Sequence, residues 1–172
     1  MPNWVVASLI ASIYAYIAMP WAVAETAASS QAFRDWALTC PPAEDCVLEQ
    51  RLFLAGGDVA EPVLRMAFQA IAERATPLVA IRVPLGVLVS PGLSLRVDQG
   101  EDQQIPLHHC RPEGCLALFP LEEDWRQALE AGRELQVGFR RLDGQTMTLP
   151  VSLLGITAGL RALEERDAAQ RR

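Results

Sequence analysis

The sequence contains no lysine, so all fifteen of its basic residues are arginines. Only 6% of its 172 residues are aromatic, and its formal net charge is −6. A protein that binds the phosphate backbone of nucleic acid needs a concentrated basic face. The negative charge and the absence of a long basic run therefore exclude a nucleic acid as the expected partner.

Common catalytic motifs are also missing. The sequence has no Gly-x-Ser-x-Gly, no His-Glu-x-x-His and no phosphate-cradling glycine loop. Its cysteines lack the Cys-x-x-Cys spacing of dithiol oxidoreductases and zinc ribbons. We therefore expect no catalytic residue, no cofactor and no metal site, and we do not expect an enzyme.

Residues 1–24 carry no charged side chain and are mostly apolar. Pro20 breaks the apolar run, which ends in Ala22-Val23-Ala24, a small-x-small site. This pattern predicts a secretory signal peptide that is cleaved before Glu25. The alternative is an uncleaved membrane anchor, because about 20 apolar residues can cross a bilayer. The first three residues have no basic side chain, so either the amino terminus alone supplies the charge or translation begins upstream.

The four cysteines form two close pairs along the chain, Cys40 with Cys46 and Cys110 with Cys115. Four cysteines allow three pairings, and only locality favours this one. Disulfides persist in oxidising compartments. Together with the N-terminal segment, they lead us to expect a periplasmic or secreted protein.

The second cysteine pair predicts a hairpin, since Arg-Pro-Glu-Gly between the two residues suits a tight turn. In that register His109 lies opposite Leu116. His108 and His109 would then point to opposite faces of the strand and could not easily bind one metal ion. We take His108, Arg111 and Glu113 as a candidate binding surface on this hairpin.

Alternation of apolar and polar residues predicts strands at 33–40, 46–54, 63–72, 78–89 and 93–97. Residues 27–31 are expected to be a mobile lead-in. The 63–72 run contains helix-forming residues, but its apolar side chains keep a period of two. Pro84 inside the 78–89 run indicates an edge strand or a bulge.

Two helices are predicted in the C-terminal half. The first covers 121–131, begins with acidic residues that the helix dipole favours, and ends at Gly132 as a C′ residue. The second starts at Ser152 as its cap and loses its apolar stripe in a polar tail from about residue 165.

Between the two helices, residues 135–139 and 147–151 predict a hairpin. A three-residue loop with Gly144 in the left-handed region gives the expected register. The order of elements predicts a mainly β protein, an antiparallel β-sandwich or open barrel with two short helices in the C-terminal half. Residues 25–172 are expected to form this single domain.

Four segments in this order resemble the invasion-associated locus B family of bacterial envelope proteins. They are Trp36-x3-Cys40-x5-Cys46, residues 81–87 continuing to 95–100, Cys110 to Cys115, and residues 152–160. The resemblance implies an exported protein of Gram-negative bacteria, with some relatives linked to entry into host cells. It brings no catalytic residues, and the pair His108-His109 is not a feature of the family.

We therefore expect a non-enzymatic module that binds an unknown protein or envelope component through an exposed sheet edge or the disulfide hairpin. Membrane association is expected only if the N-terminal segment stays uncleaved. One alternative is a periplasmic hydrolase of unfamiliar type, which needs a pocket where His, Ser or carboxylate groups converge. The other is a periplasmic protein that binds a metal ion or a small ligand.

Overall fold

The computed structural model describes residues 29–171 except 43, 55–61, 72–73 and 75. The predicted signal peptide lies outside these residues. No helix in the described part of the chain is long and apolar enough to span a membrane. The elements are β1 (Ser29–Phe33), β2 (Trp36–Cys40), β3 (Val47–Leu52), β4 (Leu64–Gln69), β5 (Leu78–Val83), β6 (Leu93–Val97), β7 (Gln103–Ile105), β8 (His109–Arg111), β9 (Gly114–Pro120), α1 (Glu123–Ala131), β10 (Glu134–Arg140), β11 (Thr146–Ser152) and α2 (Ile156–Gln170).

These strands form two antiparallel sheets. The larger has seven strands in the order β1-β2-β3-β4-β5-β9-β8, and the smaller has four in the order β11-β10-β6-β7. The two sheets do not close into a barrel over the described residues. The predicted mainly β fold, with both helices in the C-terminal half, is therefore confirmed in its open, two-sheet form.

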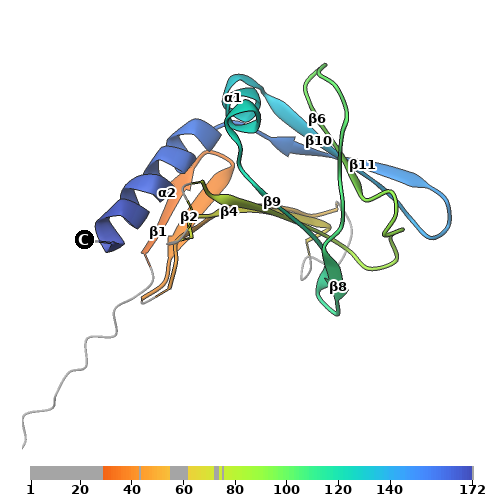
Figure 1. The fold of residues 1–172 in the computed structure, drawn as a ribbon, viewed down its shortest axis with the longest axis horizontal. Helices are drawn as coiled ribbons and strands as arrows, with labels where there is room; N and C mark the ends of the chain where they lie inside the picture. The colour runs from red at the N-terminus through yellow and green to blue at the C-terminus, as the bar shows by residue number, and fades with distance from the viewer. Residues whose placement is uncertain (1–28, 43, 55–61, 72–73, 75, 172) are drawn as a thin grey trace, which may run out of the picture.

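The core lies on one face of the large sheet. Figure 1 shows the small sheet and α2 as a second layer beside it, with α2 next to β1 and β2. The alternating residues that strand periodicity predicts as apolar are buried between these layers. In the large sheet they include Leu48, Met66, Phe68, Val79 and Ile81, and in the small sheet Leu93, Leu95, Leu135, Val137 and Val151.

A buried polar contact joins the two sheets. The Trp36 Nε1 atom donates a hydrogen bond to the Ser152 carbonyl oxygen at 3.0 Å. Gln50 Nε2 donates to the same oxygen at 3.4 Å and to the Asp35 carbonyl at 3.0 Å. Since buried polar groups are costly unless they are hydrogen-bonded, these contacts favour one arrangement of β2 and β3 against the end of β11.

Two predictions that depended on period and register are confirmed. Residues 64–69 form strand β4 and not a helix, because their alternating side chains enter the core. In the β10–β11 hairpin, Phe139 pairs with Met147 and Val137 with Leu149. Gly144 has a φ of +84°, as the three-residue loop requires.

The strand predicted at 33–40 is wrong in its first part. The chain reverses at Arg34-Asp35, and residues 29–33, partly predicted as a lead-in, pair with β2 as β1. Arg34 occupies the left-handed region with a φ of +55°. The turn has no Gly or Pro, and the residues of β1 before Phe33 are small or polar, so neither the turn nor the strand gave a local signal.

The strand predicted at 78–89 is too long. β5 ends at Val83, and the chain then leaves the large sheet, so that Val87 bridges to Arg141 beside the small one. Pro84 has no N–H to continue the ladder, which accounts for the end of the strand. The short polar strand β7 was not predicted, because its residues show no apolar alternation.

Both helices exist, but their ends differ from prediction. Gly132 ends α1 with extended backbone (φ −80°, ψ 171°), and a Cβ there would collide with the Val97 side chain. Ser152 belongs to β11, while Gly155, at a φ of +94°, is the N-cap of α2. α2 continues to Gln170, so the polar tail predicted from about 165 is helical.

Candidate interaction surfaces

The cysteine pairs favoured by locality are the pairs that the structure joins. Cys110 and Cys115 lie opposite each other in β8 and β9, with an S–S distance of 1.99 Å and a Cα–Cα distance of 4.0 Å. Pro112 and Glu113 form the turn between them. Gly114 follows at a φ of +123°, and any Cβ there would stand inside van der Waals contact of the Val83 carbonyl oxygen. The hairpin is thus pressed against β5.

The two histidines do not point apart as predicted. His108 Nδ1 lies 2.8 Å from His109 Nδ1, and the rings meet edge to face with centroids 5.1 Å apart. Strand alternation fails here because His108 precedes β8 and its N–H donates to the Leu116 carbonyl at 2.7 Å. His109 also pairs with Leu116, so two residues oppose one, as in a β-bulge.

Among the residues that the structure describes, each of these two histidine rings is hydrogen-bonded only to the other. No group of three His, Cys, Asp or Glu side chains in the described part of the chain could hold a metal ion. Neither histidine lines the pocket of about 370 Å³ on the small sheet, which includes Ser94 and Arg96, or the pocket of about 300 Å³ that includes Trp125. The convergence that the hydrolase alternative requires is therefore not found around these two side chains.

The remaining candidates on the hairpin, Arg111 and Glu113, are exposed, as is His108. Arg111 and Glu113 lie at the turn, whereas His108 immediately precedes β8. β8 is the edge strand of the large sheet (Figure 1). The structure thus brings the three predicted side chains to one exposed hairpin. Their use as a binding surface stays a prediction.

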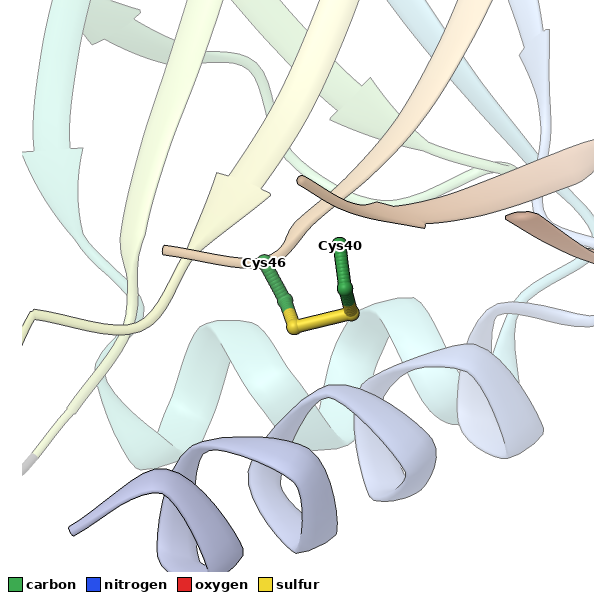
Figure 2. Close-up of a disulfide and its surroundings, with 2 residues drawn as sticks. All are labelled: Cys40 and Cys46. Atoms are coloured by element: carbon green, nitrogen blue, oxygen red, sulfur yellow. A yellow bond between two sulfur atoms is a disulfide. The ribbon is translucent and has the colours of Figure 1, made fainter. Parts of the chain in front are cut away.

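The first disulfide has a different setting. Cys40 and Cys46 join the end of β2 to the start of β3, with an S–S distance of 2.09 Å. Figure 2 shows the bond between these strands and α2, which packs against both. Cys46 is only 2% exposed. Cys40 is half-buried, so the bond lies at the margin of the packed interior.

At the other side of the large sheet, β1 is an open edge. Among the strands that the structure describes it pairs only with β2, and its residues 29–32 are exposed. Edge strands of this kind carry unpaired backbone N–H and C=O groups that another chain can bind. Sequence reasoning missed this edge, since it predicted no strand at 29–31.

Three large apolar side chains project near the tip of the β10–β11 hairpin; we call Leu85, Val89 and Leu142 the apolar tip. Their exposed fractions are 55%, 58% and 69%. Backbone hydrogen bonds hold their segments together, from Leu142 N to Gly86 O at 2.8 Å and from Leu88 N to Arg140 O at 2.7 Å. Sequence periodicity assigned Leu85 and Val89 to a strand face and so missed their exposure.

The family model described as "Invasion associated locus B (IalB) protein" matches residues 36–164, from β2 to within α2. The chain belongs to this family. The resemblance drawn from the cysteine spacing and the flanking motifs is thus confirmed. The match includes both disulfides and both sheets, whereas β1 lies before it.

Two curated relatives are named invasion protein B homologs, from Brucella abortus strain 2308 and from Brucella abortus biovar 1 strain 9-941. Each is 26% identical over 134 residues, which cover 76% of this chain and 76% of the relative. The crystal structure of invasion associated protein B from Bartonella henselae is similar with a TM-score of 0.69 and 23% identity. The matched region covers 84% of this chain and 99% of that protein. The similarity shows that the fold is that of the family.

Proposed function

We propose that this family member is an exported envelope protein that binds another macromolecule and catalyses no reaction. Its relatives are named for invasion, and the family is not known as one of enzymes. The N-terminal apolar segment and the two disulfides support export to an oxidising compartment.

The observation that carries this proposal is the apolar tip. Seven large apolar residues are exposed among the residues that the structure describes, and the three of the apolar tip are the most exposed of them, with Leu142 at 69%. Monomeric proteins seldom keep several large apolar side chains exposed at one place unless a partner covers them. Because the tip is built on two hydrogen-bonded segments, it can be offered to a partner without much loss of conformational entropy.

The open edge of β1 offers a second contact of a different kind. An extended peptide of a partner could add to the large sheet beside residues 29–33 by backbone hydrogen bonds. Such a contact would not depend on the side chains at the apolar tip. Substitutions at the apolar tip therefore test the contact made there without changing the edge of β1.

The test is cross-linking of the protein in the cells that make it, followed by identification of the cross-linked partner. We expect Leu142→Glu to abolish the cross-link, because a carboxylate would be buried in an apolar contact. Leu154→Glu is the matched control, since Leu154 is also a half-exposed leucine (53%) but lies between β11 and α2. Equal cross-linking by Leu142→Glu and the wild-type protein would remove the apolar tip from the proposal.

Export is tested separately by the intact mass of protein isolated from the envelope fraction. We expect the mass of residues 25–172 less four hydrogens, since each of the two disulfides removes two. A full-length mass with free thiols would contradict export and reopen the membrane-anchor interpretation.

A further inference from the structure

The outer face of the small sheet carries a polar trough of about 370 Å³. Strand register shows how it is built. Its floor is a row of short or uncharged residues across the four strands, in the order Thr148, Gly138, Ser94 and Gln104. Alternate residues of a strand share a face. The residues two positions before and after the floor residues therefore form two walls.

Each wall carries a guanidinium group. Gln136 and Arg96 pair across β10 and β6 on one side of the floor, and Arg140 and Thr146 pair across β10 and β11 on the other. Arg140 has no carboxylate partner among the residues that the structure describes. The trough is lined by two arginines and one carboxylate, Asp102, so it carries a net positive charge in a protein whose net charge is −6. This charge points to an anionic ligand.

The Arg96 wall is held in place by its neighbours. Asp102 lies 3.8 Å from Arg96 and 3.2 Å from the Ser94 hydroxyl, and Arg96 also donates to the Gln136 side-chain oxygen. A guanidinium has five N–H groups, so these contacts leave donors free. A side chain already fixed in this way loses little entropy when it binds a ligand.

The floor determines the class of ligand. It presents hydroxyl and amide groups and no large apolar side chain, since the Phe139 side chain is buried beneath the sheet. Gly138 lies mid-strand, where a missing side chain lets a ligand approach the backbone closely. Such a lining suits a molecule rich in hydroxyl groups and does not suit an apolar one.

The trough also has room for a polymer. It runs across the strands from β11 to β7, the two edges of the sheet, so nothing in these four strands closes its ends. Three inter-strand spacings give it a length of about 14 Å, enough for a short oligosaccharide. A bound peptide would more readily lie along a sheet edge, where it can use backbone hydrogen bonds.

We propose that this trough binds a carboxylated glycan, with Arg96 and Arg140 contacting carboxylates and Ser94, Thr148 and Gln104 contacting hydroxyl groups. This site is distinct from the apolar tip and goes beyond the proposed function. It assigns a carbohydrate ligand to a surface whose five proposed contact residues all lie in strands of the small sheet.

The experiment is calorimetric titration of the full chain with oligogalacturonate of six residues, with neutral maltohexaose and with polyglutamate as comparisons. We expect saturable binding of the oligogalacturonate alone. Arg140→Gln should weaken it about tenfold, the effect of one lost charged hydrogen bond. Arg82→Gln is the control, because Arg82 lies in β5 of the other sheet.

Gly138→Thr tests the floor independently. The φ of Gly138 suits any residue, and a Cβ there would contact Ser94 Cβ at 3.4 Å, so the protein should fold with an unchanged melting temperature while binding is lost. If Gly138→Thr unfolds the protein, the result with Arg140→Gln decides whether the trough binds the glycan. The Arg140 side chain is exposed and supports no core contact, so its loss should not affect folding. Absence of saturable binding, equal binding of polyglutamate, or an equal loss in Arg82→Gln would overturn the proposal.

Discussion

The two hairpins of the C-terminal half reach the same topology by different means. The β8–β9 hairpin has three residue pairs, a two-residue turn and a disulfide. The β10–β11 hairpin has seven pairs, a three-residue loop and no cysteine. In β10, Leu135, Val137 and Phe139 are buried, whereas no residue of β8 is fully buried. The comparison shows that the covalent bond is present where apolar burial is not available to hold the strand.

The largest effect should come from removing apolar burial in the longer hairpin. Phe139→Ala is expected to lower the free energy of unfolding by about 4 kcal/mol, because it leaves a cavity between the sheets. Urea denaturation measures this change. Leu142→Ala, a few residues on at the exposed loop, should change stability by less than about 0.5 kcal/mol. A similar loss in both variants would mean that the inner face of β10 does not hold its hairpin.

Next in size is the turn glycine of the short hairpin. Gly114→Ala should cost about 3 kcal/mol, because its φ of +123° strongly disfavours a side chain and the new Cβ would meet the Val83 carbonyl. Thermal unfolding of the oxidised protein tests this. An unchanged melting temperature would show that the hairpin does not depend on its close approach to β5.

Removal of the disulfide itself should cost less. The double substitution Cys110→Ala and Cys115→Ala is expected to lose about 2 kcal/mol, the chain-entropy value for so short a loop. Amide hydrogen exchange should show the loss of protection concentrated in β8 and the adjoining turn. If protection falls equally in β10, the two hairpins are coupled and the contrast between them fails.

The smallest effect should be found at the turn glycine of the long hairpin. Gly144→Ala should cost about 1 kcal/mol, since its φ of +84° is unfavourable but a new Cβ meets nothing within 4 Å. The same thermal measurement compares it with Gly114→Ala. A cost as large as that of Gly114→Ala would show that backbone strain, and not close packing, dominates at both turns.

Local sequence signals predicted the parts of the fold that local physics determines. Period-two alternation identified β4, and register identified the position of Gly144. The turn at Arg34-Asp35 and the cap at Gly155 depend on tertiary contacts. A Cβ at Gly155 would collide with the Phe33 carbonyl, a neighbour 122 residues away that no local pattern reveals.

The candidate surfaces were predicted less completely. Cysteine spacing led to the disulfide hairpin and its exposed residues. His108 and His109 were expected on opposite faces of the strand, but the bulge brings their rings into contact. The trough needs side chains from four strands, and one of those strands, β7, was not predicted. The two arginines of the trough are far apart in sequence, at positions 96 and 140. The pairing of β6 with β10 is what brings them to one face of the sheet.

The position of α2 gives this protein an order of assembly. α2, a helix of 15 residues that follows all the described strands, contacts β1, β2 and β3. These strands are therefore made well before the helix that covers them. An oxidant reaches Cys46 most easily before α2 docks, because this residue is almost fully buried afterwards. A chain that stopped before Ile156 would leave this end of the core open to water. The closing helix therefore makes synthesis through α2 a condition for completion of the fold.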